Sequence, residues 1–537
     1  MNESGFSLRF TCLLALIACF VPEFALAQTP MMTDSRLLLA QKLDQDGDLI
    51  RAYEKYLEYL IAFPDDSAAK QSLGRIARQI KQQLRLSNPD YRKLLLDLRS
   101  SQAIDLYIHL VDLLANNYVE PNSARPNLLF QHGLDEIGFL LQRPMALEPI
   151  LGALEFPEDS RLEETFQRFR TRQVPSSGEL REHLLEFLGE IKQLGLTQKS
   201  TRFANLLVME LAHGACHGLD EYTIFLNPSE KRILEQGIAG KVPSVGLQLK
   251  LANQFLEVSS VLPGSPAQEA GLQKGDQIHA LQGIAASELS LPQARGLLAG
   301  MDGTELLVHI RNEGASLPTE IRLTRRLLNT PSVEFEMEAL ADLPVGWIRV
   351  SHFQSTTSSE LREALAQLQT AGVHGLMLDL RGNPGGHFKS ALSSAESFLS
   401  QGVLAQCESQ WKEFQKMFTS AGVNPCVLPM VILIDQDTAS SAEMIAMALK
   451  ENGRARVVGV KSRGKGTIQC LVPLDKAPWD KLPGGIHLTV ARMKSPTGTL
   501  LDHGIQPDIT VEGNSEVLAT SAKVELLRLL GKMPEMK

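Results

Sequence analysis

The sequence predicts a multidomain α/β protein with a helical N-terminal region, a small domain of mixed strands and helices, and an α/β core. Three patterns support this fold class. Apolar residues recur at helical spacing in residues 28–235, short alternating strands fill residues 236–328, and apolar strands alternate with helices through residues 329–515. Residues 516–537 are expected to form a helical tail. At 537 residues, the chain is too long for a single hydrophobic core.

The first 27 residues predict a secretory signal peptide. Arg9 precedes a long apolar run, and small residues stand at Ala25 and Ala27, so we expect cleavage after Ala27. Two alternatives are lipid attachment at Cys19, in the stretch LIAC, and an uncut membrane anchor. The apolar residues after Cys19 and the small residues further on favour cleavage. The protein is therefore expected to be periplasmic or otherwise exported.

The composition limits what the chain can bind. A net charge of −9 with 21% charged residues offers no general basic footprint for nucleic acid. After the signal peptide, no stretch approaches the ~18 continuous apolar residues that a membrane helix needs. A disulfide is permitted outside the cytoplasm, but spacing does not reveal pairing among the four cysteines that remain: Cys216, Cys407, Cys426 and Cys470. Because the chain has no CxxC motif, we expect no zinc site, and we expect no cofactor.

The helical region begins with a segment that resembles one tetratricopeptide-type helix pair, at residues 36–82. Ala52, Tyr56 and Leu60 have helical spacing, and Pro64 interrupts the pattern. Since no second copy is found, a plain helical hairpin remains an alternative. His213 and His217 have i, i+4 spacing without an HExxH motif, so we interpret them as histidines on a helix surface. The region is a candidate for oligomerisation or for docking an adaptor.

The small domain is expected to contain five strands and two short helices. The strands are SVGLQLKL, FLEVSSVL, QIHALQGI, ELLVHIR and EIRLTRRL. In the first helix, Ser265 is the expected N-cap, Pro266 the first helical residue and Gly271 the stop. The second helix is expected to run from about Ser290 to Gly300. Mixed strands with two helices in about 90 residues are typical of a small, compact binding domain.

The core is expected to have a largely buried sheet. Its strands are GWIRVSHF, GLMLDLRG, MVILID and ARVVGV, and its helices are 358–370, 389–400 and 440–451. Functional sites of such sheets lie at the carboxyl ends of the strands.

Two of these strands end in stretches that suit a catalytic site. LDLRGNPGG brings glycines whose N–H groups can face a ligand, although a tight turn explains it equally well. VILIDQDTASSAEM places Ser440 at a helix start. Ser440 and Glu443 fit a capping box, which is a sufficient structural reason for both. This stretch alone favours the capping role, but Ser440 is also a candidate nucleophile, because a helix N-terminus favours developing negative charge.

A third stretch, GVKSRGKGTIQ at 459–469, supplies a lysine. It imitates a phosphate loop, but Gly466 stands where magnesium binding needs Ser or Thr, and a strand-like run follows instead of a helix. The chain lacks a G-x-S-x-G elbow. A buried, neutral lysine can act as the base for a serine, so Lys465 is a candidate partner for Ser440.

In their order along the chain, these motifs resemble the C-terminal processing (tail-specific) proteases, which are serine peptidases with an inserted PDZ domain and a Ser–Lys dyad. The motifs are DLRGNPGG, DTASSAE, GRGKGTIQ and HGIQPDI, and the resemblance covers roughly residues 205–512. It implies that Ser440 is the nucleophile, that Lys465, 25 residues later, is the base, and that Gln469 orients the lysine. The family often has Ser-Ala-Ser before the glutamate, whereas this chain has Ser440-Ser441-Ala442.

The resemblance also implies two binding functions. The oxyanion donors would be the N–H of Gly386, or of Gly385, and the N–H of Ser441. The stretch SVGLQL resembles the carboxylate-binding loop of a PDZ domain, so we expect Val245, Gly246 and Leu247 to bind a substrate C-terminus.

Together these observations predict an exported serine endopeptidase that acts on proteins or peptides with free C-termini. One alternative from another functional class is a catalytically inactive PDZ scaffold, and a second is a phosphate-loop nucleotide-binding protein. Hydrolysis of an unstructured test protein would exclude the inactive scaffold. The nucleotide-binding alternative requires nucleotide binding that depends on Lys465.

Overall fold

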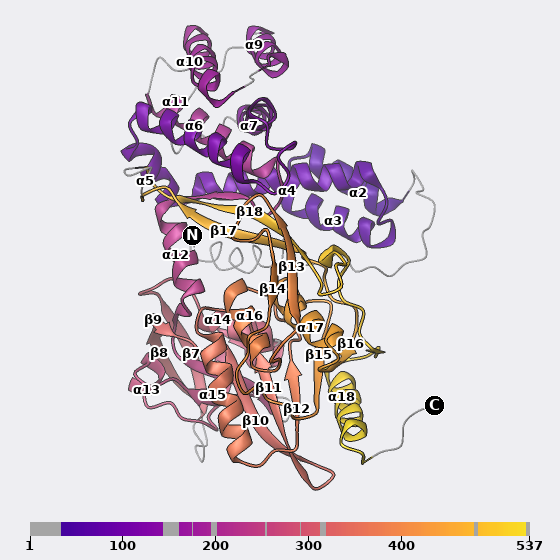
Figure 1. Ribbon diagram of the computed structural model, residues 1–537. Coiled ribbons are helices and arrows are strands. Elements are labelled where there is room, and N and C mark those ends of the chain that lie inside the picture. The colour runs from indigo at the N-terminus through magenta and orange to yellow at the C-terminus, as the bar shows by residue number, and fades with distance from the viewer. Residues whose placement is uncertain are drawn as a thin grey trace. The chain divides into compact units, whose positions relative to one another are not determined.

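The computed structural model describes residues 34–142, 160–173, 176–194, 201–252, 255–289, 291–311, 318–476 and 482–532. The predicted signal peptide and Cys19 lie outside these residues. The chain divides into two compact units. The first consists of Met1–Arg232, Gln406–Met417 and Gly466–Lys494, and the second of Ile233–Ala405, Phe418–Lys465 and Ser495–Lys537. Figure 1 labels their elements.

The first unit begins with three packed helices, α2 (Ser35–Gln45), α3 (Leu49–Ala62) and α4 (Ser67–Ser87). Asp34, Asp48 and Asp66 cap their N-termini by accepting backbone N–H groups. The turn that contains Pro64 separates α3 from α4, and Tyr56 and Ile76 meet in the core between them. The segment predicted to form a helix pair thus holds α3 and α4, with α2 as a third helix against α3.

The rest of the helical region is built around α11 (Thr201–His217), which packs against α6 (Ser100–Asn117) and α7 (Pro126–Leu141). Glycines permit this close approach, because a Cβ on Gly214 would lie 2.6 Å from the Cα of Gly133. The other helices are α5 (Pro89–Asp97), α9 (Ser160–Thr171), α10 (Ser177–Gln193) and α12 (Pro228–Ile238), within which the chain passes to the second unit.

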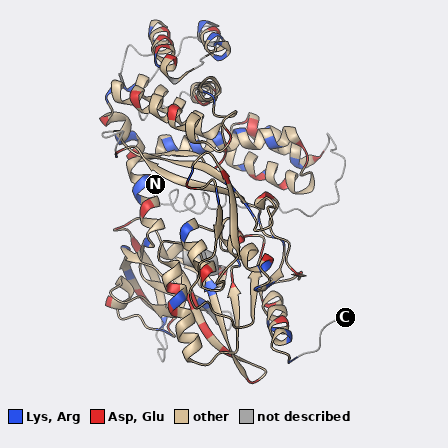
Figure 2. Ribbon diagram, in the orientation of Figure 1, with Lys and Arg blue, Asp and Glu red and all other residues tan. Residues whose placement is uncertain are grey.

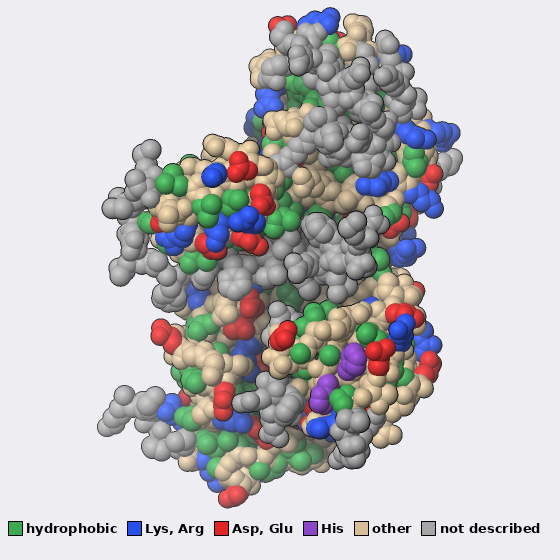
Figure 3. All heavy atoms as spheres, turned by 180° about the vertical axis from the view of Figure 1, so that it is seen from behind, with side chains coloured by type: hydrophobic (Ala, Val, Ile, Leu, Met, Phe, Trp, Pro, Cys, Tyr) green, Lys and Arg blue, Asp and Glu red, His purple; other side chains and the backbone are tan. Residues whose placement is uncertain are grey.

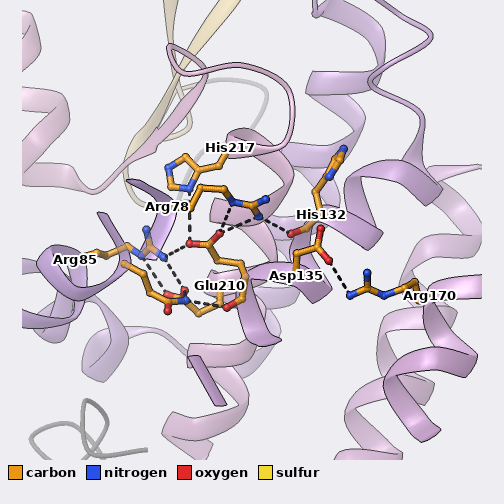
Figure 4. Close-up of polar contacts among 9 residues, drawn as sticks. Arg78, Arg85, His132, Asp135, Arg170, Glu210 and His217 are labelled. Atoms are coloured by element: carbon orange, nitrogen blue, oxygen red, sulfur yellow. Dashed lines mark hydrogen bonds and ion pairs between the residues drawn. The ribbon is translucent and has the colours of Figure 1, made fainter. Parts of the chain in front are cut away.

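These helices enclose a network of buried charges (Figure 4). Glu136 on α7 and Glu210 on α11 are fully buried, and both accept hydrogen bonds from Arg85 on α4. Arg78 donates to Glu136 at 3.0 Å, and Gln82 donates to Glu210 at 2.7 Å. Since a buried charge is stable only when it is paired, these contacts hold α4, α7 and α11 in one arrangement.

Of the two histidines predicted to lie on a helix surface, His213 is buried and His217 is half-buried with its side chain turned towards this network. His213 is 5% exposed, and its ring packs edge-on against Tyr91 and Phe225. His217 Nδ1 lies 3.8 Å from Glu136 Oε1. Burial lowers the pKa of both imidazoles. The surface prediction is wrong because α6 and α7 cover faces of α11 that the spacing alone leaves open.

The first unit also contains an antiparallel sheet that the sequence patterns do not predict. Its centre is β18 (Gly485–Lys494), which pairs with β1 (Ile224–Leu226), with β17 (Thr467–Pro473) and with the end of β13 (Val403–Ser409). The short strand β14 (Met417–Thr419) lies next to β13. Only β17 is recognised in advance, from TIQCLVPL.

In the second unit, residues 241–329 form the small domain. One sheet has the order β3-β4-β5-β7-β8, and β6 pairs with β5. The strand predicted at EIRLTRRL is divided at Arg325: its first part joins this sheet, and its second part, β9, pairs with β2. The elements are β2 (Lys241–Ser244), β3 (Leu247–Ala252), β4 (Phe255–Val261), α13 (Pro266–Glu269), β5 (Gln277–Leu281), β6 (Ile284–Ala285), η2 (Ala286–Glu288), α14 (Leu291–Leu298), β7 (Glu305–Arg311), β8 (Thr319–Thr324) and β9 (Arg326–Asn329).

The core of the second unit is a sheet with the order β10-β11-β12-β15-β16-β19. All neighbouring pairs are parallel except β10 with β11. Its elements are β10 (Val333–Leu340), β11 (Leu343–Val350), α15 (Thr357–Thr370), β12 (Gly375–Asp379), α16 (Phe388–Glu396), β15 (Met430–Ile434), α17 (Ser441–Glu451), β16 (Arg456–Gly459), η3 (Leu501–His503), β19 (Ile509–Thr510) and α18 (Ser515–Leu529). The four predicted strands and three predicted helices are present, although α16 ends earlier than expected.

The segment predicted to be a C-terminal tail belongs to this core. Helix α18 packs against β12, β15 and β16, and Ala522 and Leu526 are fully buried beside Val431. The sequence did not reveal this because the helix follows the last strand of the sheet and its partners lie up to about 150 residues earlier.

Charge is mixed over the surface. Lys and Arg are mixed with Asp and Glu along the helices in Figure 2, and both signs are interspersed on the face drawn in Figure 3. In the part of the chain that the structure describes, no helix is both long enough and apolar enough to cross a bilayer. The cysteines at 216, 407, 426 and 470 are present as thiols and not as disulfides.

Candidate active site

The site lies where two neighbouring parallel strands end. β12 and β15 run side by side, and their carboxyl ends lead into the glycine turn, residues 382–387, and the serine turn, residues 435–441. Thr438 Oγ1 donates to the carbonyl of Leu380 at 2.9 Å, and Ala439 N–H donates to the carbonyl of Asn383. The two turns are thereby joined, as expected for a site at the edge of such a sheet.

Ser440 has an unusual backbone conformation. Its φ is +55° and its ψ is −120°, which a residue with a side chain adopts only at a cost of about 1–3 kcal/mol. It directly precedes α17 and is 8% exposed. Surrounding contacts must therefore impose this conformation, and strain of this kind is concentrated at functional sites.

The carboxylate of Glu443 supplies several of these contacts. Oε2 accepts the N–H of Ser440 at 2.7 Å and the N–H of Lys465 at 2.9 Å. Oε1 accepts the hydroxyl of Ser462 at 2.6 Å and the N–H of Gly464 at 2.7 Å. One side chain thus performs the carboxylate half of the expected capping box and also binds the backbone of the lysine turn, residues 462–466.

Glu443 is fully buried, and burial raises the pKa of its carboxyl group. The four donors oppose that shift, because each one stabilises the charged form. Sequence reasoning found Glu443 only as a cap. Its contacts with the lysine turn join residues 19 to 22 positions apart, so no local pattern reveals them.

Further contacts hold the lysine turn. Arg463 N–H donates to the carbonyl of Thr438 at 3.0 Å, and its guanidinium pairs with Asp437 at 2.9 Å. Ser462 accepts the N–H of Ile505 at 2.7 Å, which ties the turn to the HGIQPDI segment. The strand β17 starts at Thr467, so the turn does not lead into the helix that a phosphate loop requires, and the nucleotide-binding alternative loses its structural basis.

Asn383 shapes the glycine turn. Its Oδ1 accepts the N–H of Gly385 at 2.9 Å, and its Nδ2 donates to the carbonyl of Val350 at 2.8 Å. A Cβ on Gly385 would lie 2.7 Å from the Cβ of Ser440, so only glycine permits this approach. Sequence reasoning did not single out Asn383, although it lies inside the quoted motif.

The contacts at the two turns distinguish between neighbouring residues. The hydroxyl of Ser441 donates to the carbonyl of Gly386 at 3.0 Å, and Ser441 is 2% exposed. The N–H of Gly385 is engaged by Asn383, whereas no hydrogen bond among the described residues uses the N–H of Gly386 or of Ser441. These last two groups are available to a ligand beside Ser440.

Gln469 lies on β17, in the first unit. Its amide nitrogen donates to the hydroxyl of Thr467 at 2.9 Å and to that of Thr489 at 3.2 Å. These two contacts fix the orientation of the Gln469 amide. Ser440 and Lys465 belong to the second unit, where Glu443 accepts a hydrogen bond from the backbone N–H of each.

The predicted tail-binding loop precedes β3. Val245 is buried, and the carbonyls of Val245 and Gly246 accept the N–H groups of Ala267 and Leu262. Gly246 has a φ of +82°, and a Cβ there would lie 2.2 Å from the Cβ of Ser265. The next residue, Leu247, starts β3, which is an edge strand of the sheet and packs beside α14.

Within the described ranges, no cluster of three or more His, Cys, Asp or Glu residues could hold a metal ion.

Comparison with known proteins identifies both domains of the second unit. The model for peptidase family S41 matches residues 344–511, and the model for the PDZ domain matches residues 257–312. The chain is 36% identical over 300 residues to the carboxyl-terminal-processing protease of Synechocystis sp., covering 55% of this chain and 68% of that protein. It is 32% identical over 328 residues to the chloroplastic C-terminal processing peptidase of Tetradesmus obliquus, covering 58% and 68%. Among solved structures, it is similar to the photosystem II D1 C-terminal processing protease, with 23% identity, a TM-score of 0.42, and coverage of 78% of this chain and 97% of that one.

Proposed function

Because this chain belongs to the carboxyl-terminal-processing proteases, serine proteases of peptidase family S41 with a PDZ domain, we propose that it is an exported endopeptidase with a Ser440–Lys465 dyad that selects substrates by their C-termini. The observation that supports the dyad most directly is the shared oxygen of Glu443. It lies within 2.9 Å of the backbone nitrogens of both proposed catalytic residues.

The reaction is acyl transfer. The neutral amine of Lys465 accepts the proton of the Ser440 hydroxyl as Oγ attacks the scissile carbonyl. The resulting lysine ammonium donates this proton to the departing amine, which leaves an ester on Ser440. A water molecule, deprotonated by the amine, then hydrolyses the ester and regenerates the serine.

The oxyanion is bound by the N–H groups of Gly386 and Ser441, each worth about 2.7–4 kcal/mol of transition-state stabilisation. Gly386 is favoured over Gly385 because the N–H of Gly385 already donates to Asn383. Gln469 orients Lys465, as the resemblance implies. Its amide nitrogen is held by two threonine hydroxyls, and its carbonyl oxygen is the group that can accept from an amine.

Hydrolysis of an unstructured test protein by the purified mature chain tests this function. Cleavage by the wild type that is absent in Ser440→Ala supports it. Absence of cleavage in both, with the PDZ domain still binding peptide tails, would favour the inactive scaffold.

Substrate selection is assigned to the loop of Val245, Gly246 and Leu247 and to β3, the outer strand of its sheet. An extended tail can add to this edge strand beside α14, and the loop can receive its carboxylate through N–H groups other than that of Gly246, which donates to Ser244 Oγ at 3.3 Å. Gly246 itself is unsuitable as a test position, because any side chain there collides with Ser265 and disturbs the domain.

A change in the substrate therefore tests tail recognition. A protein substrate that ends in an amide is expected to be cleaved at least about tenfold more slowly than the same protein with a free carboxylate, because one charge-assisted contact is lost. The ratio of kcat/KM values measures this. A short peptide that reaches Ser440 unaided serves as the control and should be cut equally in both forms. Equal rates for the two protein substrates would contradict tail recognition.

Replacing Glu443 tests how the two catalytic residues are positioned. In Glu443→Gln, an amide NH₂ replaces one acceptor oxygen, so two of the four donors lose their partner. Each such buried group costs about 1–3 kcal/mol of folding free energy. We expect kcat to fall by about 100-fold with a small change in KM, since the tail-binding loop is untouched. Urea unfolding measures the loss of folding free energy, and steady-state kinetics measure kcat and KM. An unchanged kcat would show that the Glu443 carboxylate does not position the dyad.

We also propose a location and partners for the protein. We propose export through the signal peptide cleaved after Ala27, with lipid attachment at Cys19 as the alternative. The substrates are proteins or peptides with free C-termini, and no nucleic acid is involved. Helices α2 to α11 are proposed as the surface for an adaptor or for a second copy of the chain. N-terminal sequencing of the exported protein decides between the two processing sites.

A further inference from the structure

A segment of four residues, His352 to Ser355, connects the glycine turn with the PDZ domain, and its two central residues, Phe353 and Gln354, are buried. We call this segment the strap. It lies between β11 and α15 in the second unit, and none of its side chains is part of the proposed dyad or of the oxyanion donors.

On one side, the strap holds the glycine turn. Phe353 N–H donates to the carbonyl of Gly385 at 2.8 Å, and the carbonyl of Phe353 accepts the N–H of His387 at 2.7 Å. A Cβ on Gly386 would lie 2.1 Å from the Phe353 oxygen, so the two backbones are in direct contact. Any displacement of Phe353 therefore moves the residue whose N–H is assigned to the oxyanion.

On the other side, the strap holds both connections to the PDZ domain. Ser355 N–H donates to the carbonyl of Ile238 at 2.8 Å, where the chain enters the domain. The amide nitrogen of Gln354 donates to the carbonyl of Thr330 at 2.9 Å, where the chain leaves it. The two connections are themselves joined, because Thr330 N–H donates to the carbonyl of Gly240 and β2 pairs with β9.

Gln354 is the centre of this arrangement. It is 1% exposed, and its amide nitrogen also donates to Thr356 Oγ1 and Glu360 Oε1, while its oxygen lies 3.0 Å from His352 Nε2. Its amide packs against Gly240, where an added Cβ would lie 2.6 Å from Nε2. A buried side chain with every polar atom engaged responds to movement of any one partner.

We propose that Gln354 is a positioning residue that couples the PDZ domain to the glycine turn, so that a substrate tail bound by the domain sets the position of the Gly386 N–H. This inference rests on the proposed function, since it takes the tail as ligand and the Gly386 N–H as oxyanion donor. The coupling passes from residues 238–240 and 330 to Gln354 through hydrogen bonds, from Gln354 to Phe353 through the backbone, and from Phe353 to the glycine turn through hydrogen bonds.

The test compares three substrates in four proteins. The substrates are a protein with a free C-terminus, the same protein amidated, and a short peptide, and the proteins are wild type, Gln354→Ala, Gly240→Ala and Gln369→Ala. Gln369 is an exposed glutamine on α15 and serves as the matched control. Gly240→Ala displaces the Gln354 amide from the opposite side, so it decides the result if Gln354→Ala does not fold. Tail affinity is measured separately, by fluorescence anisotropy of a labelled tail peptide in the Ser440→Ala background.

In Gln354→Ala and Gly240→Ala, we expect the preference for the free tail to fall by about tenfold, within the range typical of coupled sites. The lost preference should appear as a lower kcat for the free-tailed protein, while the affinity for the tail peptide stays at the wild-type value. The control Gln369→Ala should keep the wild-type preference. The coupling is overturned if both folded variants keep the wild-type preference, or if tail affinity falls in the same proportion. A wild type that cuts free and amidated tails equally would refute tail recognition itself and this coupling with it. A wild type without any proteolysis would refute the proposed enzyme.

Discussion

Ser440→Ala is expected to abolish proteolysis, with a rate reduction of about 10⁶-fold, as for other serine proteases that lose the nucleophile. The backbone of the site should survive, because the N–H of residue 440 still donates to Glu443. The loss in folding free energy should be small, about 1 kcal/mol, which is the value of an N-cap hydroxyl. Cleavage of a labelled unstructured protein measures the first effect and urea unfolding the second.

Ser441→Ala is the matched control, since it removes a neighbouring hydroxyl of the same kind. That hydroxyl donates to the carbonyl of Gly386 and is nearly inaccessible, whereas the backbone N–H assigned to the oxyanion is retained. We expect most of the activity to remain, with a reduction of about tenfold at most because the glycine turn loses one hydrogen bond. An inactive Ser441→Ala beside an active Ser440→Ala would reverse the assignment.

Lys465→Arg is expected to be inactive as well. The guanidinium keeps the positive charge, but it does not release its proton at any pH at which the protein is folded, so the Ser440 proton has no acceptor. For the wild type, the rate should rise with pH, because only the neutral amine is a base and its population increases as protons are removed.

Lys461→Arg provides the control for this substitution, because Lys461 lies four residues earlier and next to the same turn. It should retain activity and the same pH dependence. Stopped-flow acylation with an ester substrate, measured across pH for wild type and both variants, gives the comparison. Substantial acylation by Lys465→Arg would exclude lysine as the base.

Much of the second unit could be predicted because its signals are local. The four core strands are runs of apolar residues bounded by glycines and polar turns, and α13 begins at Pro266 after the N-cap Ser265, as expected. The family resemblance, which rests on motifs quoted from the sequence, is confirmed by the S41 and PDZ matches and by the relatives at 36% and 32% identity.

Other features could not be predicted because they depend on distant partners. β18 is the central strand of the sheet in the first unit, and its partner strands come from distant parts of the chain, residues 224–226, 406–409 and 467–473. His213 and His217 have the spacing of a helix surface, but the helices that pack against α11 bury His213 and cover most of the His217 side chain. The sequence predicts α18 to be a helical tail, because its contacts with the core sheet involve strands far earlier in the chain.

The sequence by itself determined which residues can perform chemistry here: a serine at a strand–helix junction, a lysine in a glycine-rich turn, and glycines with free backbone geometry. These properties depend on residue type and short-range spacing, so they are readable without a structure. Only the tertiary structure decided which polar groups of these neighbouring residues are already hydrogen-bonded and which are left for a ligand. The buried carboxylate of Glu443 joins the serine and lysine turns, Asn383 occupies the N–H of Gly385, and Gly386 occupies the hydroxyl of Ser441. The physical reason is that each donor or acceptor in a buried site is assigned by proximity in space, and folding sets that proximity through elements far apart in the chain.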